Sequence, residues 1–132
     1  MPIESHMKVL VADDSMVVRR LVCARLAADG HEVLEAADGQ EAVDVALRER
    51  PDVIVLDRQM PKMDGFEVCT RLRQDKTLRS GILMLTDNRG EHTLIESLER
   101  GADEFMSKPF SPRELSVRVR LLGTRLSLAQ AG

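Results

Sequence analysis

The chain has 132 residues, of which 43% are hydrophobic and 31% charged, and its formal net charge is −3 at pH 7. This length supports one domain with a hydrophobic core, and the balance of apolar and charged residues excludes an intrinsically disordered chain. No apolar run approaches the length that crosses a bilayer, which argues against a membrane protein. The acidic balance gives no electrostatic reason to expect direct nucleic-acid binding.

The cysteines and the N-terminus carry no sign of a secreted protein. Cys23 and Cys69 are too few and too far apart for a disulfide framework or a metal site, and we expect both to be small buried side chains on helices. Residues 1–7 lack the regions of a signal peptide, so a cytoplasmic location is expected. Because Ser5 to Met7 resembles a cloning scar, residues 1–7 are interpreted as an N-terminal extension. The histidines have no metal-ligand spacing and are expected at the surface: His6, His31 and His92.

The first predicted elements are a strand and a helix. Lys8 to Ala12 is a short apolar run that ends in the acids Asp13 and Asp14, and it predicts a strand. From Ser15 a helical period takes over and continues until Gly30. The apolar face of this helix is predicted at Val18, Leu21, Val22 and Leu26.

The second strand is predicted over His31 to Ala36. Asp38 and Glu41 then have the spacing of a helix N-cap. The apolar face of that helix is predicted at Ala42, Val43, Ala46 and Leu47. The next run, Val53 to Leu56, is continuous and rich in β-branched residues, as in a strand covered on both faces, and Asp57 ends it.

The third helix begins at another N-cap pattern, formed by Asp64 and Glu67. Its inward stripe is predicted at Phe66, Cys69 and Leu72. Ile82 to Leu85 is the next buried run, and it ends at Thr86, a hydroxyl where the earlier strands end in carboxylates. A weaker fourth helix is predicted before Gly101, from Leu94, Ile95 and Leu98.

The last predicted elements are a strand over Asp103 to Ser107, followed by Lys108 and Pro109, and a final helix. The stretch from Ser111 to Glu114 combines a Ser N-cap, Pro at the first helical position and Glu at the third. The apolar stripe of this helix is predicted at Leu115, Val119, Leu122 and Leu126. Residues 123–132 add no new periodic element and are predicted to be the end of this helix or a linker.

Five strands alternating with five helices predict an α/β fold with a parallel sheet and helices on both faces. In such folds ligands and chemistry lie outside the carboxyl ends of the strands. These ends carry Asp13, Asp14, Asp57, Thr86 and Lys108. Alone, Asp57 fits a functional carboxylate or a solvent-exposed strand cap. The set favours function, because gathered carboxylates call for a cation such as Mg²⁺, and a hydroxyl and an ammonium suit a phosphoryl group.

The sequence resembles the receiver domain of two-component response regulators, the flavodoxin-like family that includes the chemotaxis regulator CheY. The resemblance rests on VADDS (11–15), VLDRQMPKMDG (55–65), MLTD (84–87) and GADEFMSKPF (101–110) in the order and spacing of the family. It implies a single (βα)5 doubly wound receiver domain over residues 8–122, with a five-stranded parallel sheet in the order 2-1-3-4-5.

The resemblance also implies roles for the strand-end residues. Asp57 matches the aspartate that accepts a phosphoryl group from a sensor histidine kinase or phosphotransfer protein. Asp14 matches a direct Mg²⁺ ligand and Asp13 a ligand that acts mainly through water. Asp57 itself and the backbone carbonyl of Gln59 complete the metal site. Such a domain is a stoichiometric phospho-acceptor that assists its own phosphorylation and dephosphorylation, and not a turnover enzyme.

Two further residues match the switch of the family. Thr86 matches the hydroxyl that moves inward on phosphorylation, and Phe105 the aromatic that occupies the space it leaves. Lys108 matches the cation that pairs with the aspartyl phosphate, and the family commonly holds the bond to Pro109 cis. The resemblance implies a remodelled face of the fourth helix, fifth strand and fifth helix, which controls an output domain or partner. Nothing after position 122 is long enough for an output domain, so a stand-alone receiver and the front of a longer regulator are both open.

The chain departs from the family pattern at three positions. Phe105 stands where Tyr is common and lacks the hydroxyl. Asp87 stands where a small residue is common, and Arg58 is an unusual charge beside Asp57. Asp87 is expected either to slow access to Asp57 or to face solvent in a loop, and Arg58 either to affect the site or to face solvent.

Two other functions share parts of this pattern. A dehalogenase-type phosphatase also uses a strand-end Asp, Thr and Lys, but it needs a second acid where this chain has Gln59. An interaction module that has lost phosphorylation is the other, although every required acid, Thr86 and Lys108 are present. The opposite charges of Asp103, Glu104 and the fifth-helix arginines further predict a phosphorylation-dependent homodimer.

Overall fold

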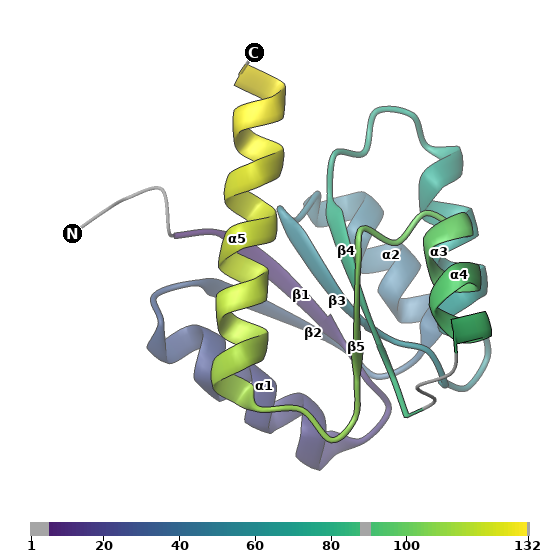
Figure 1. Cartoon of the computed structure of the whole chain (residues 1–132), viewed down its shortest axis with the longest axis horizontal. Helices are drawn as coiled ribbons and strands as arrows, with labels where there is room; N and C mark the ends of the chain where they lie inside the picture. Colours follow the sequence, from purple (N-terminus) through teal and green to yellow (C-terminus); the bar gives the residue numbers. More distant parts are fainter. Residues whose placement is uncertain (1–5, 88–90, 132) are drawn as a thin grey trace.

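The computed structural model describes residues 6–87 and 91–131. The strands are β1 (Lys8–Ala12), β2 (Glu32–Ala36), β3 (Val53–Asp57), β4 (Gly81–Thr86) and β5 (Glu104–Ser107). The helices are α1 (Met16–Ala28), α2 (Gly39–Glu49), α3 (Gly65–Gln74), α4 (Glu91–Glu99) and α5 (Pro112–Ala131). The parallel strands form one sheet in the order β2-β1-β3-β4-β5, which confirms the predicted α/β fold. Helices α1 and α5 cover one face of the sheet, and α2, α3 and α4 cover the other (Figure 1).

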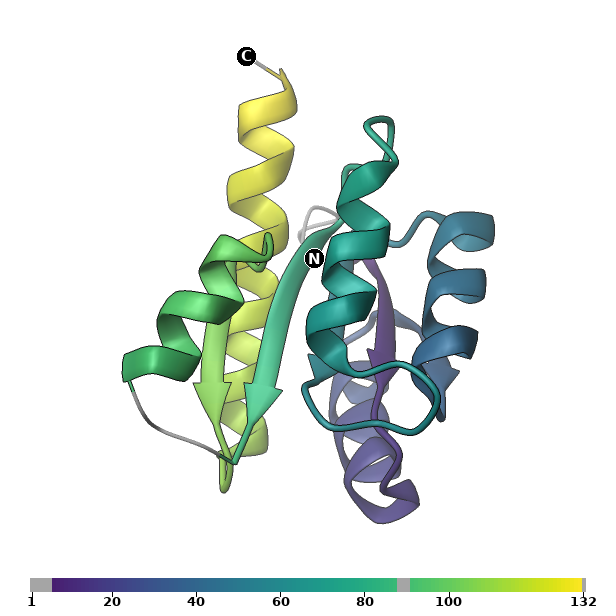
Figure 2. The ribbon, with the colours of Figure 1, turned by 90° about the vertical axis from the view of Figure 1, so that its right-hand side faces the viewer.

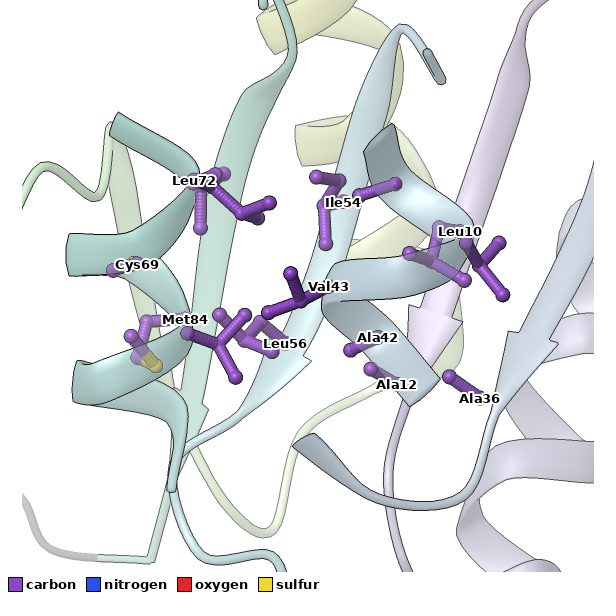
Figure 3. Close-up of a cluster of buried hydrophobic side chains, with 14 of the residues drawn as sticks. Leu10, Ala12, Ala36, Ala42, Val43, Ile54, Leu56, Cys69, Leu72 and Met84 are labelled. Carbon is purple, nitrogen blue, oxygen red and sulfur yellow. The ribbon is translucent and has the colours of Figure 1, made fainter. Parts of the chain in front are cut away.

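The buried strands divide their side chains between two apolar layers. Along β3, Ile54 and Leu56 point to the layer under α2 and α3, whereas Val53 and Val55 point to the layer under α1 and α5. Both layers are closed to solvent, so the strand reads as a continuous apolar run in the sequence. The first layer includes Leu10, Ile54, Leu56, Leu72 and Met84 (Figure 3).

Four helices begin at a side-chain cap, three of them where the capping patterns predict and α1 at Ser15, where the helical period begins. In each case the side chain of the N-cap residue accepts a hydrogen bond from a backbone N–H in the first turn. The pairs are Ser15 with Val18, Asp38 with Glu41, Asp64 with Glu67, and Ser111 with Glu114, at 3.3, 2.8, 2.9 and 3.3 Å. Helix α1 ends before Gly30, whose φ of 95° lies in the left-handed region that favours glycine.

Three burial predictions are wrong, those for Leu21, Leu47 and His31; Leu47 is 36% exposed, and Cys23 is only partly buried. Leu21 is 54% exposed, because the neighbouring Val22 takes the position that faces the sheet. His31 is buried, and its Nδ1 accepts a hydrogen bond of 3.1 Å from the backbone N–H of Met7. Cys69 is buried as predicted. His6 is exposed, and the side chain of His92 lies outside the part that the structure describes.

Helix α5 is longer than its packed stripe. It runs to Ala131, so residues 123–131 are helical, and its C-terminal turns reach past the sheet (Figure 1). Gly123 lies against the start of β1, where a Cβ atom would stand 1.9 Å from the Met7 sulfur. Among the described residues, no helix is both long and apolar enough to cross a membrane.

Candidate functional site

The carboxyl ends of four strands bring the predicted site residues to one edge of the sheet. Asp13 follows β1, Asp57 ends β3, Thr86 ends β4 and Lys108 follows β5. The Lys108 ammonium lies 3.3 Å from Asp13 Oδ2 and 3.3 Å from Asp57 Oδ1. Both carboxylates are buried, whereas the lysine side chain is 24% exposed. The site is therefore a buried carboxylate pair bridged by one cation that remains in reach of solvent.

Burial and charge shift the protonation of this group. Burial, and next the Asp13 charge, raise the pKa of Asp57 to about 6, although Lys108 opposes both effects. Burial alone would lower the pKa of Lys108, but the charges of Asp57 and Asp13 hold that pKa above its ordinary value. Lys108 therefore stays positively charged, and Asp57 is predominantly ionised at neutral pH.

Three carboxylates can offer ligands to one metal ion. Asp13, Asp14 and Asp57 each supply an oxygen, and these oxygens lie within 4.8 Å of one another. Asp14 is exposed, whereas Asp13 is held by the Ser15 N–H, which donates to its Oδ1 at 2.9 Å. A set of hard oxygen donors at a solvent-accessible edge fits Mg²⁺, which keeps several of its waters. Gln59 lies two residues after Asp57 in the β3–α3 loop and is exposed.

The candidate switch residues lie on the two strands at the β5 edge. Thr86 is 1% exposed, and its carbonyl accepts a 2.6 Å hydrogen bond from the Lys108 N–H. Phe105 is half-buried and pairs in register with Met84, two residues before Thr86. The peptide bond between Lys108 and Pro109 is cis, as the resemblance implies.

The loop after Asp57 closes tightly onto the strand that carries it. The Gly65 N–H donates to the Arg58 carbonyl at 2.7 Å, and the Arg58 N–H donates to the Leu85 carbonyl at 2.8 Å. A Cβ atom at Gly65 would stand 2.6 Å from the Asp57 carbonyl oxygen, so a side chain there would displace the loop. The residue that begins α3 therefore also fixes the backbone beside the candidate nucleophile.

The two unusual charges near the site have different surroundings. Asp87 is exposed. The Arg58 guanidinium lies over the Phe66 ring, 4.8 Å from its centroid. Its buried Nε has no hydrogen-bond partner among the residues that the structure describes. Arg58 therefore packs against α3 and is not a freely solvated loop side chain.

One supporting residue was not singled out from the sequence. Arg19 on α1 donates from Nη1 to the Asp13 carbonyl at 2.8 Å and from Nε to Glu35 Oε1 at 2.9 Å. It therefore anchors the backbone at the end of β1. Its only sequence signal is a basic residue one turn after the Ser15 cap, which is equally typical of a solvated helix surface.

Comparison with known proteins identifies the family. The family model described as "Response regulator receiver domain" matches residues 9–120. The chain belongs to this family. PhoP of Bacillus subtilis (strain 168), an alkaline phosphatase synthesis transcriptional regulatory protein, is 47% identical over 122 residues, which cover 92% of this chain and 50% of PhoP. The receiver domain thus spans about half the length of the curated relatives it matches.

Solved receiver structures have the same fold. The receiver domain of Francisella response regulator 1452 has a TM-score of 0.86 at 34% identity, covering 90% of this chain and 98% of that one. The chemotaxis protein CheY4 of Vibrio cholerae has a TM-score of 0.82 at 38% identity, covering 87% of this chain and 97% of that one. The chain is therefore a receiver domain of the two-component response regulator type, with the predicted flavodoxin-like sheet.

Proposed function

We propose that this receiver domain accepts a phosphoryl group on Asp57 from a sensor histidine kinase or a phosphotransfer protein. The observation that carries the proposal is the Lys108 ammonium, 3.3 Å from both the Asp57 and Asp13 carboxylates at the strand-end edge. An Asp57 oxygen attacks the phosphorus of a phosphohistidine, so a P–O bond forms while the P–N bond breaks. The imidazole that leaves takes up a proton from solvent.

The residues of the site suit this transfer. Lys108 faces the position where negative charge develops on the phosphoryl oxygens, and it remains charged. Mg²⁺, held by Asp13, Asp14, Asp57 and the Gln59 carbonyl, would neutralise further charge on those oxygens. Gln59 has no carboxylate, which argues against the second acid of a dehalogenase-type phosphatase. The domain is then a stoichiometric acceptor, because the phosphoryl group stays on its own side chain.

Labelling with a small phosphodonor tests the assignment. With acetyl phosphate and Mg²⁺, the wild-type chain should gain one phosphoryl group by intact mass, and chelation of the metal should suppress the gain. Asp57→Asn should gain none, whereas Asp44→Asn, which changes an exposed acid on α2, should be labelled normally. Continued labelling of Asp57→Asn would sink the proposal.

Helix α1 offers a docking surface for the kinase. Its first turns expose Met16, Val17 and Leu21 at 56, 78 and 54%, directly after the acids of the site. A partner that brings a histidine to Asp57 must cover this end of α1, so an apolar helix face on the kinase fits it. Val17→Glu should slow transfer from a phosphorylated kinase while acetyl phosphate labelling stays unchanged. Equal slowing of both reactions would contradict this docking surface.

The surface formed by β5 and α5 suits self-association or an output partner, but its charged side chains are already paired within the chain. Glu104 is paired within the chain to Arg118 at 3.1 Å and Arg125 at 3.7 Å, and Asp103 is paired to Arg73 at 2.9 Å. A groove of about 630 Å³ beside α5 is lined by Glu104, Glu114, Val117, Arg118, Leu121, Leu122 and Arg125. An apolar contact between two copies in this groove is therefore the form of the homodimer that we propose.

Sedimentation tests the homodimer. Beryllofluoride with Mg²⁺, which mimics the phosphoryl group, should shift the wild-type chain toward a dimer, and Leu121→Glu should prevent the shift. An unchanged wild-type monomer at high concentration would remove the homodimer from the proposal. We further propose that residues 8–122 form a cytoplasmic receiver that controls an output domain or a partner protein, and that this chain makes no direct contact with nucleic acid.

A further inference from the structure

One side chain of α3 joins three separate segments of the chain. The Arg73 guanidinium donates to the Gly101 carbonyl at 3.0 Å, the Ser80 carbonyl at 2.9 Å and Asp103 Oδ2 at 2.9 Å. Asp103 in turn accepts from the Ile82 N–H at 2.9 Å and donates its own N–H to the Ile82 carbonyl at 2.8 Å. Arg73 therefore ties α3 to the start of β4 and to the turn between α4 and β5.

The turn between α4 and β5 lies directly against the stem of Arg73. Gly101 has a φ of +107°, and a Cβ atom there would stand 2.6 Å from Arg73 Cγ. The adjacent Arg100 adds a second tie to α3, since it donates to Thr70 Oγ1 at 3.3 Å. Its guanidinium also lies over the Phe66 ring, 5.7 Å from the centroid. The C-terminal end of α4 is thus fastened to α3 by polar and stacking contacts.

The rest of α4 is packed quite differently. Of the α4 side chains that the structure describes, those of residues 93–99, only Thr93 and Ser97 are buried. The Ser97 hydroxyl donates to the Thr93 carbonyl at 2.8 Å, inside the same helix. The apolar residues Leu94, Ile95 and Leu98 are 37, 47 and 47% exposed. Over this stretch α4 therefore places small hydroxyl side chains, and no large apolar ones, on the core.

We propose that Arg73 is a positioning residue. It makes the α4–β5 turn the fixed end of the face formed by α4, β5 and α5, the face that changes on phosphorylation. The inference rests on the proposed phosphorylation of Asp57. Arg73 holds Asp103, two residues before Phe105, in register with β4, while the loosely packed body of α4 moves about the clamped end. The clamp uses charge-assisted hydrogen bonds in a half-buried position, which are stronger than the contacts of buried hydroxyls.

Beryllofluoride with Mg²⁺ separates this role from a purely structural one. Fluorine NMR reports occupation of the site, and methyl NMR of Leu94, Ile95 and Leu98 reports the response of α4. Arg73→Lys should bind beryllofluoride within about twofold of wild type but lose about half or more of the methyl shift changes. The reason is that one ammonium cannot bridge three acceptors in the fixed geometry of a guanidinium. Arg71→Lys, at an exposed position of the same helix, should respond like wild type.

A full α4 response in Arg73→Lys would overturn the proposal, as would a loss of stability with no change in the response. If Arg73→Lys fails to fold, Asp103→Asn provides the second variant, because it keeps an acceptor for the Ile82 N–H and removes only the charge that faces Arg73. It should also reduce the methyl shift changes, and a full response would again overturn the clamp. A wild-type chain that does not bind beryllofluoride contradicts the proposed function of Asp57 instead, so the two failures are distinguishable.

Discussion

Helices α3 and α4 lie side by side on the same face of the sheet but are packed in opposite ways (Figure 2). They have similar lengths, 10 and 9 residues. Helix α3 buries Phe66, Val68, Cys69 and Leu72. Helix α4 turns Thr93 and Ser97 inward and leaves its leucines exposed. Neighbouring helices of one layer can therefore differ widely in how firmly the core holds them.

The difference has an energetic basis. Full burial of one large apolar side chain contributes about 1.5–3 kcal/mol, whereas a buried hydroxyl that bonds its own helix contributes about 0.5–1.5 kcal/mol. Helix α3 is thus anchored by several apolar side chains, and it begins at Gly65 against the backbone of Asp57. Among the described side chains of α4 and the turn that follows it, Arg100 ties the C-terminal end to α3, and the proposed movement of the helix body turns about that end. Helix α3 is therefore suited to hold the site in place, and α4 is suited to respond to a change at the site.

The largest expected effect is a direct test of this difference. Leu72→Ala should lower the free energy of unfolding by about 2–5 kcal/mol, because Leu72 is fully buried. Leu98→Ala on α4 should change it by no more than about 0.5 kcal/mol, because Leu98 is 47% exposed. Urea denaturation of both variants gives the two values. Equal costs would show that α4 is as firmly packed as α3.

The start of α3 should also be intolerant of a side chain. In Gly65→Ala the new methyl group would meet the Asp57 carbonyl oxygen at 2.6 Å and Arg58 Cα at 2.8 Å. The forced backbone shift should cost about 1–3 kcal/mol and slow acetyl phosphate labelling of Asp57. Arg71→Ala, at an exposed position of the same helix, is the control and should leave both quantities unchanged. Normal labelling of Gly65→Ala would show that the backbone at the start of α3 does not affect phosphorylation of Asp57.

Adding a hydroxyl to α3 and removing one from α4 should also distinguish the two helices, with smaller losses of stability. Cys69→Ser places a hydroxyl in the apolar layer under α3, and it should cost about 1–3 kcal/mol. Ser97→Ala removes a hydroxyl from the buried side of α4 and should cost less than about 1 kcal/mol, since alanine favours the helix. Thermal denaturation compares the two. A greater loss for Ser97→Ala would mean that its hydroxyl anchors α4.

The smallest effect is expected from pH, on the other face of the sheet. Burial lowers the pKa of His31 below its ordinary value of 6.5, while Asp29 opposes and His6 adds to the shift. The unfolded chain therefore binds a proton more readily, and stability falls as pH drops through about 6.5 toward the folded pKa. The raised pKa of Asp57 acts with the opposite sign, because protonation of that buried acid favours the folded state.

The variant His31→Asn isolates this contribution. Its amide oxygen can still accept the Met7 N–H bond, but it does not titrate. On acidification the free energy of unfolding of the wild type should fall relative to that of His31→Asn. The contribution of Asp57 is the same in both proteins and cancels in this difference. The difference between the stability losses of Leu72→Ala and Leu98→Ala should be the same in the wild-type and His31→Asn backgrounds. A pH-independent difference would mean that His31 is not held neutral by the fold.

The elements and the edge that carries the site were predictable from short-range patterns. The Asp38 and Asp64 caps, and the buried run that ends in Asp57, each depend on residues within a few positions of one another. Parallel strands then bring their carboxyl ends to one edge, which is why strand-end residues could be grouped before any distance was known. The 3.3 Å approach of Lys108 to Asp13, which lies 95 residues earlier, needed the assembled sheet.

The sequence by itself determined the five strands, the five helices, the helix caps and the identity of the acids at the strand ends, because period and capping are local properties of the chain. Only the tertiary structure decided that Leu21 and the α4 leucines face outward, that His31 is buried, and that Arg73 joins three distant segments. The physical reason is that these features depend on which surfaces of the two layers meet. An apolar stripe shows that a helix can be buried, but only the packing of its neighbours decides which of its residues are.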